Sequence, residues 1–129
     1  HARIQNDPRV VVMPQTNARF LKAEAFPERP ALCAIDVSFI SLKLILGPVF
    51  GAMAAGGEVV ALVKPQFELQ AADLRKGIVK DEETRLRVMD DMRAFLKANL
   101  PGVEEKGLTD SPIKGAKGNL EFLWLLRAP

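Results

Sequence analysis

Residues 31–37, Ala-Leu-Cys-Ala-Ile-Asp-Val, decide the fold, because this nearly all-apolar run ends beside a single acid, Asp36. Such a run is typical of a strand buried on both faces of a parallel sheet. Glu58–Lys64 (EVVALVK) has the same character and stops at Pro65. Between the two runs, Ser41 begins a stretch whose apolar residues have helical spacing, and Gly56-Gly57 ends it. The order strand, helix, strand predicts a parallel α/β unit.

The flanking segments extend this unit on both sides. Arg9–Met13 (RVVVM) is predicted to be a further strand, and residues 66–80 a long polar loop. Asp81 is suited to cap a helix over 82–99, whose predicted apolar stripe consists of Leu86, Met89, Met92, Phe95 and Leu96. Strands near 103–111 and 119–126 flank a Gly-rich loop, which predicts an antiparallel hairpin. The predicted fold class is therefore α/β, a Rossmann-like parallel sheet that ends in an antiparallel hairpin.

Composition limits the classes of function. The 129 residues suffice for one domain, and a net charge of +2 does not by itself indicate nucleic-acid binding. No apolar run reaches the roughly 18 residues that cross a bilayer. Cys33 is the one cysteine, which suits a reducing cytoplasm. We therefore expect a cytoplasmic protein without a membrane segment or a metal site, in which any RNA affinity comes from local clusters of basic residues.

Charged residues at the ends of the buried strands are the candidate site. Asp36 lies at the end of the strand predicted at residues 31–37, and Lys64 closes the strand predicted at residues 58–64. In open α/β sheets ligands bind beyond the carboxyl ends of the strands, and buried charges need partners. The two side chains should face a shared cleft, or form an ion pair that ties the strands together. Glu121 interrupts an apolar strand, where it is either a third site residue or an edge charge that faces water. Glu68 and Asp73 are expected to be solvated.

An ordered set of motifs carries a family resemblance. The motifs are Asn6-Asp7-Pro8-Arg9-Val10-Val11-Val12, Thr16-Asn17-Ala18-Arg19, Ile35-Asp36-Val37-Ser38-Phe39-Ile40-Ser41-Leu42, Leu62-Val63-Lys64-Pro65-Gln66-Phe67-Glu68, Lys76-Gly77-Ile78-Val79-Lys80-Asp81, Ser111-Pro112-Ile113-Lys114-Gly115 and Gly118-Asn119-Leu120-Glu121-Phe122. Together they resemble the hemolysin A (TlyA) family, whose RNA-methyltransferase domain is similar to FtsJ. The resemblance covers nearly the whole chain.

The resemblance implies a class I methyltransferase sheet and transfer of a methyl group from S-adenosylmethionine to a ribose 2′-hydroxyl of ribosomal RNA. The partner would be ribosomal RNA or a ribosomal subunit. In the family's Lys-Asp-Lys-Glu tetrad, Asp36, Lys64 and Glu121 match the last three positions. Asp36 would also contact the cofactor, as would Asn17 near its adenine, although Asn17 is equally suited to form a turn. The basic residues expected to contact RNA phosphates are Arg75, Lys76, Lys114 and Lys117.

Three features of the family have no counterpart in this sequence. They are the first tetrad lysine, the glycine-rich loop that cradles the methionine part of S-adenosylmethionine, and the S4-like RNA-binding module. The resemblance therefore implies that residues 1–129 are a partial FtsJ-like domain with an incomplete sheet, and that the chain alone is inactive. In the family, two strands separate the counterparts of Arg9–Met13 and Ala31–Val37. We expect an exposed sheet edge and, with it, dimerisation, strand exchange or a lack of order in residues 1–30.

Two other classes of function stay open at this point. One is a hemolysin-like membrane-active or non-enzymatic interaction protein, as the family's name suggests. The other is a nucleotide-binding α/β module of a different class.

Overall fold

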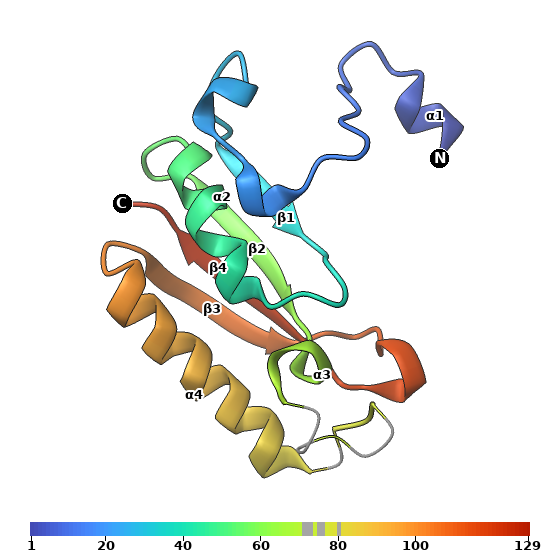
Figure 1. Cartoon of the computed structure of the whole chain (residues 1–129), viewed down its shortest axis with the longest axis vertical. Helices are drawn as coiled ribbons and strands as arrows, with labels where there is room; N and C mark the ends of the chain where they lie inside the picture. Colours follow the sequence, from blue (N-terminus) through green and yellow to red (C-terminus); the bar gives the residue numbers. More distant parts are fainter. Residues whose placement is uncertain (71–73, 75–76, 80) are drawn as a thin grey trace.

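A four-stranded sheet with helices on one side forms the body of the molecule (Figure 1). The computed structural model describes residues 1–70, 74, 77–79 and 81–129. In chain order, the elements are α1 (Ala2–Gln5), the 3-10 turns η1 (Ala18–Phe20) and η2 (Ala23–Ala25), β1 (Leu32–Ile35), η3 (Leu42–Leu44), α2 (Leu46–Ala52), β2 (Glu58–Val63), α3 (Pro65–Glu68), α4 (Glu82–Asn99), β3 (Glu104–Asp110), η5 (Ala116–Gly118) and β4 (Phe122–Arg127).

The strands lie in the order β1-β2-β4-β3. The strands β1 and β2 are parallel, with Ile35 opposite Ala61, whereas β4 is antiparallel to both of its neighbours, β2 and β3. The parallel unit and the closing hairpin predicted from the sequence are therefore confirmed. The arrangement brings the carboxyl ends of β1 and β2 beside the amino end of β4, where Val63 pairs with Phe122.

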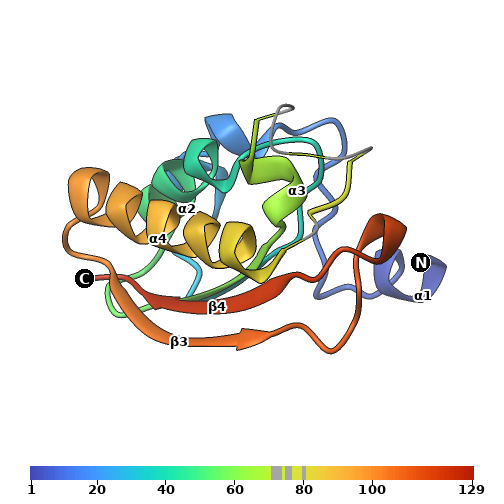
Figure 2. The same cartoon turned by 90° about the horizontal axis from the view of Figure 1, so that it is seen from below.

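The core lies between the sheet and the helices α2 and α4, which are on the same side of the sheet (Figure 2). Burial alternates along β2 and β4, so that every second side chain faces this core. Trp124 and Leu46 are fully buried there, and Met89 and Met92 of α4 pack against them in the same cluster. Asp81 caps α4 as predicted, because its carboxylate accepts a hydrogen bond from the amide of Thr84 at 2.7 Å.

The predicted strand at Arg9–Met13 is wrong, because these residues form no helix or strand. Val11 is 84% exposed, and no strand of the described sheet lies beside the segment. A β-branched run alone does not hold an extended strand, since its backbone groups need a partner strand. The predicted helix after Ser41 divides into η3 and the shorter α2. On α4, Leu86 is exposed whereas Arg85 is buried, so the predicted apolar stripe is displaced by one position there.

Candidate active site

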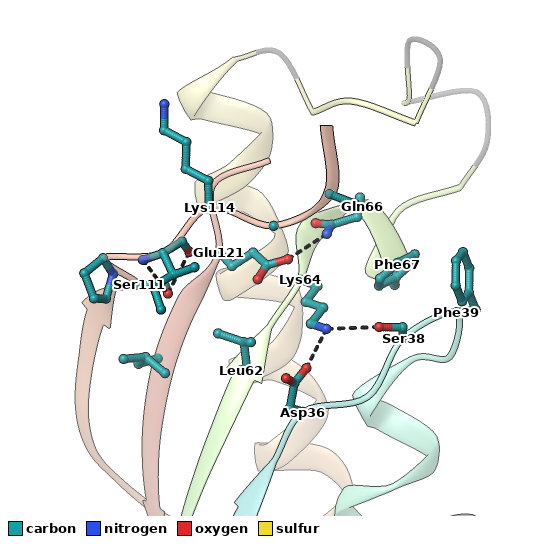
Figure 3. Close-up of a pocket in the computed structure, with 15 residues that line it drawn as sticks. Asp36, Ser38, Phe39, Leu62, Lys64, Gln66, Phe67, Ser111, Lys114 and Glu121 are labelled. Atoms are coloured by element: carbon teal, nitrogen blue, oxygen red, sulfur yellow. Dashed lines mark hydrogen bonds and ion pairs between the residues drawn. The ribbon is translucent and has the colours of Figure 1, made fainter. Parts of the chain in front are cut away.

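A pocket of about 570 Å³ lies where the carboxyl ends of β1 and β2 meet the start of β4 (Figure 3). The three charged residues predicted for the site all line this pocket: Asp36, Lys64 and Glu121. The pocket is also lined by Ser38, Phe39, Gln66, Phe67, Lys114 and Gly115. We call it the Lys64 pocket. The sheet topology explains why these side chains lie together, because two parallel strands present both of their carboxyl ends at the same edge of the sheet.

Lys64 lies at the centre of one group of contacts. It precedes α3, and Pro65 takes the first helical position after it. The amine Nζ forms an ion pair with Oδ1 of Asp36 at 2.6 Å and donates to Oγ of Ser38 at 3.1 Å (Figure 3). The side chain of Lys64 is 11% exposed and that of Asp36 is 72% exposed. The two alternatives left open by the sequence, an ion pair between the strands and a shared cleft, therefore both hold. Asp36 and Lys64 tie the two strands together and also face the pocket.

Glu121 is held apart from this pair by a different set of contacts. It is 4% exposed, so it is not a solvent-facing edge charge. Its Oε2 accepts a hydrogen bond from Nε2 of Gln66 at 2.8 Å, and Gln66 is itself 7% exposed. The backbone of Gly115 also lies against the carboxylate, because a Cβ atom at this position would overlap Oε2. The carboxylate is thus fixed between an amide and the backbone of the loop that precedes β4.

Glu68 joins the loop after β1 to the segment after β2. One carboxylate oxygen accepts from the hydroxyl of Ser41 at 2.6 Å, and the other accepts from the amide of Leu42 at 2.8 Å. The expectation that Glu68 is solvated was wrong. Burial raises the pKa of the Glu68 carboxyl, and the hydrogen bonds from Ser41 and Leu42 oppose that rise. The rings of Phe39 and Phe67 make a second contact between the same two segments, with their centroids 4.9 Å apart.

The other residues predicted for the site do not all lie at the pocket. Lys114 lines the Lys64 pocket, while Lys117 lies on η5 just beyond the lining residues. Asn17 does not line the pocket. Its side chain accepts from the amide of Arg19 at 3.0 Å and caps η1, which is the turn-forming role. Arg75, Lys76 and Asp73 lie outside the described residues.

Sequence reasoning missed the buried polar residues Gln66 and Asn119, both of which hold parts of this edge in place. A signal was present, because both lie within two residues of a predicted site residue, Lys64 or Glu121. Among the described residues, no group of three or more His, Cys, Asp or Glu side chains is arranged to bind a metal ion. The helices in the described ranges include none that is both long and apolar enough to cross a membrane.

The chemistry open to the pocket is proton transfer and charge stabilisation. An amine lies between a carboxylate and a hydroxyl, and a second, buried carboxylate lies on the opposite wall (Figure 3). The exposed ring of Phe39, at 90% exposure, stands at the rim with a positive φ of 61°. A bulky residue in that conformation is uncommon and is found preferentially at functional sites.

Comparison with known proteins gives a consistent result. YqxC of Bacillus subtilis, a protein provisionally named as an rRNA methyltransferase, is 43% identical over 129 residues, which cover 98% of this chain and 45% of YqxC. The 16S/23S rRNA (cytidine-2′-O)-methyltransferase TlyA of Mycobacterium tuberculosis is 40% identical, over 95% of this chain and 46% of TlyA. The chain thus spans about half the length of these curated relatives.

Solved structures agree with the sequence comparison. A crystal structure of a Lactococcus lactis protein provisionally named a hemolysin superposes with a TM-score of 0.92 at 42% identity, covering 98% of this chain and 61% of that one. The model of the FtsJ-like methyltransferase family matches residues 1–128. The four-stranded mixed α/β sheet is consistent with that fold. Because this family model matches nearly the whole chain, the chain belongs to the FtsJ-like methyltransferase family.

Proposed function

We propose that the protein that carries this chain transfers a methyl group from S-adenosylmethionine to a ribose 2′-hydroxyl of ribosomal RNA, in the cytoplasm. The observation that carries the proposal is the convergence of Asp36, Lys64 and Glu121 on one pocket at the carboxyl edge of the sheet. Relatives named as rRNA methyltransferases support the choice of substrate. We propose further that residues 1–129 supply the C-terminal part of the methyltransferase domain. The chain alone would not catalyse methyl transfer, since no lysine in it matches the first tetrad position.

The pocket residues suit the reacting end of the cofactor. The volume of the Lys64 pocket, about 570 Å³, lies within the range of small-molecule sites. The exposed Asp36 carboxylate can accept hydrogen bonds from the cofactor's ammonium or hydroxyl groups, and the rings of Phe39 and Phe67 offer faces to a cation. S-adenosylmethionine, when bound, supplies an electrophilic methyl group on a positively charged sulfur. Asn17 remains a proposed contact for the adenine.

In this proposal Lys64 handles the proton of the attacking hydroxyl. The hydroxyl must lose its proton as the new bond forms, and the proposed acceptor, once neutral, is Nζ of Lys64, the pocket amine that contacts both Asp36 and Ser38. Asp36 contacts Nζ and is open to solvent, so it provides a route by which the ammonium can release its own proton. Glu121, fixed by Gln66 and Gly115, contributes a stationary negative charge on the opposite wall, which helps to orient the reacting groups.

Basic and aromatic residues at the rim suit an RNA substrate. Lys114 and Lys117 are proposed phosphate contacts, together with Arg75 and Lys76. The exposed ring of Phe39 beside the pocket offers a surface on which an unpaired base can stack. RNA affinity should therefore fall as salt is raised. Binding of ribosomal RNA that does not change with salt would argue against the proposed phosphate contacts.

The test of the proposed chemistry is Lys64→Ala in the whole protein, assayed with tritiated S-adenosylmethionine on ribosomal RNA. We expect loss of methyl transfer with near-normal cofactor affinity, because the lysine acts on the proton rather than on binding. Lys97→Ala, an exposed lysine of α4, is the matched control and should retain activity. Near-normal turnover by Lys64→Ala would remove Lys64 from the mechanism, and methyl label on a base instead of the ribose would refute the 2′-hydroxyl assignment.

A further inference from the structure

Asn119 is a buried amide whose three polar contacts join two loops at the rim of the Lys64 pocket. It is 2% exposed. Its Oδ1 accepts from the amide of Val79 at 3.0 Å, and its Nδ2 donates to the carbonyls of Gly77 and Ala116, both at 2.9 Å. Both amide hydrogens and the carbonyl oxygen thus have partners, which is the condition under which burying an asparagine side chain is tolerated.

The contact with Ala116 is local, but those with Gly77 and Val79 reach across 40 or more positions of the chain. The backbone of Asn119 also closes the turn, because its carbonyl accepts from the amide of Gly115 at 2.8 Å and its own amide donates to the carbonyl of Ala116 at 3.2 Å. One residue therefore closes the 115–119 turn and attaches it to the 77–79 segment.

A second contact joins the same two loops. Lys117 adopts a positive φ of 58°, a conformation that costs free energy in a lysine and persists only where the surroundings enforce it. Its amine lies 3.0 Å from the point where a Cβ atom of residue 77 would stand, and residue 77 is a glycine with a φ of +77°. Gly77 therefore leaves room for the Lys117 side chain, which lies against the backbone of the 77–79 segment.

We propose that Asn119 is a positioning residue for RNA binding, which holds the basic turn Lys114–Gly118 at the pocket rim by attaching it to residues 77–79. This inference rests on the proposed RNA substrate, but it concerns affinity and not methyl transfer. Glu121 follows Asn119 by two residues, so the contacts of Asn119 also fix the position of the basic turn relative to the buried Glu121 carboxylate. Asn119 does not contact RNA in this proposal. It holds Lys114 and Lys117 in position, so that both can contact phosphates at the same time.

The experiment replaces Asn119 in the whole protein. Asn119→Ala leaves the amide of Val79 and the carbonyl of Gly77 without their partner. We expect the KM for ribosomal RNA to rise by about tenfold, with kcat changed by less than about threefold. The slope of log affinity against log salt should also become shallower by about one, as when one phosphate contact is lost. Hydrogen exchange at the amides of residues 77–79 should become faster.

Two further variants make the test specific. Asn99→Ala makes the same chemical change at an exposed amide that donates only to the carbonyl of Phe95, and it should leave all three measurements unchanged. Asn119→Gln keeps both the acceptor and the donors but displaces them by one methylene group, so its effect should be intermediate. This variant carries the test if Asn119→Ala does not fold.

The outcomes separate this proposal from the proposed methyl transfer. If the wild-type protein binds ribosomal RNA but transfers no methyl group, filter binding, the salt slope and hydrogen exchange still decide the role of Asn119. Unchanged RNA affinity in the asparagine variants would overturn it. An equal fall in kcat, RNA affinity and thermal stability, with the salt slope unaltered, would also overturn it, because that pattern indicates a purely structural residue.

Discussion

At the scale of single residues, the position of the Glu121 carboxylate depends on the absence of a side chain at residue 115. A Cβ atom there would overlap Oε2 of Glu121 and lie 2.5 Å from Cδ. The carboxylate is the end of a flexible side chain, so it can move aside without unfolding the chain, but it must then break its buried hydrogen bond with Gln66, at a cost of about 1–3 kcal/mol. Gly115 is thus a determinant of site geometry.

We therefore predict that Gly115→Ala lowers kcat for methyl transfer by about 100-fold, because misplacing a reacting group by about 1 Å has effects of this size. The free energy of unfolding should fall by no more than the lost hydrogen bond contributes, about 1–3 kcal/mol. Single-turnover assays and urea denaturation of the whole protein measure the two quantities. Gly51→Ala is the control. No atom lies within 4 Å of its added Cβ, and in α2 the change should stabilise the fold by up to about 1 kcal/mol. Full activity of Gly115→Ala would show that Glu121 can act from a displaced position.

Glu68 makes the stability of the site edge depend on pH. Burial raises the pKa of its carboxyl above the ordinary 4.5, so the folded chain binds this proton at a higher pH than the unfolded chain does. The contribution of Glu68 to stability is therefore fully present below pH 4.5 and is lost as the pH rises through the raised folded pKa. Glu68→Gln keeps an acceptor for Leu42 but carries no charge at any pH.

The stability of Glu68→Gln relative to the wild type should accordingly increase as the pH is raised from about 4 to about 8. Urea denaturation at several pH values measures the difference. Glu24→Gln, an exposed change on η2, should show no such trend. Parallel curves for Glu68→Gln and the wild type would mean that the carboxyl titrates alike in the folded and unfolded chain.

The sequence was sufficient to identify the charges at the strand ends, but not the residues that hold them. Asp36 and Lys64 stand out because each closes an apolar run, and Glu121 because it interrupts one. Gln66, Glu68 and Asn119 lie in polar stretches, where most side chains are solvated. Their burial follows from partners 26 to 55 positions away in the chain, such as Ser41, Glu121 and Gly77. Nearness in the chain to Lys64 and Glu121 marks Gln66 and Asn119 as candidates, but no local pattern identifies the distant partners that bury them.

At the scale of elements, α4 is attached to the hairpin by two arginines in different surroundings. Arg85 is 5% exposed, donates twice to Oδ1 of Asp110 and places its guanidinium 4.1 Å from the ring centroid of Phe122. Arg93 pairs with Glu105 at 2.8 Å through two hydrogen bonds, but its side chain is 43% exposed. In the sequence the two arginines look alike, because each follows a pair of acids: Glu82-Glu83 precedes Arg85, and Asp90-Asp91 precedes Arg93.

We predict that Arg85→Ala lowers the free energy of unfolding by about 2–4 kcal/mol, since it removes a buried stacking contact and the packing of a long side chain. Arg93→Ala should cost at most about 1 kcal/mol, as exposed pairs do. Urea denaturation of both variants at the same pH makes the comparison. Equal losses would indicate that the charge pairs, and not burial against Phe122, attach the helix.

Element by element, the predictions succeeded where the signal was local. The strands β1 and β2 and the helix α4 with its Asp81 cap were predicted, because each has an apolar run or periodicity of its own. The terminal hairpin also formed as predicted. Arg9–Met13 has the composition of a strand but lies in the described fold without a neighbour, so its local preference is not realised. A strand needs a neighbouring strand to supply partners for its backbone hydrogen bonds, whereas a capped helix forms most of these bonds within itself.

At the scale of the whole molecule, the two edges of the sheet differ in character. The β3 edge (EEKGLTD) carries charges of both signs, which is a common protection against pairing with another chain. The β1 edge (LCAI) carries none, and Leu32 on it is 69% exposed. On the face away from the helices, the apolar side chains of β2 and β4 are only partly buried: Val60, Leu62, Leu123 and Leu125. An uncharged edge beside an apolar face favours pairing with a second strand.

We therefore propose that the 129-residue chain associates with itself through β1, and we predict a weight-average mass that rises with concentration in sedimentation experiments. Leu32→Lys and Ala34→Lys place a charge on this edge and should shift the chain toward the monomer without loss of secondary structure, because Leu32 and Ala34 are both exposed. Val11→Lys introduces the same charge at a residue that is 84% exposed but outside the sheet, so it should leave the association unchanged. A monomer at every concentration would refute the proposal. An equal effect of all three lysines would show that added net charge, and not the β1 edge, controls association.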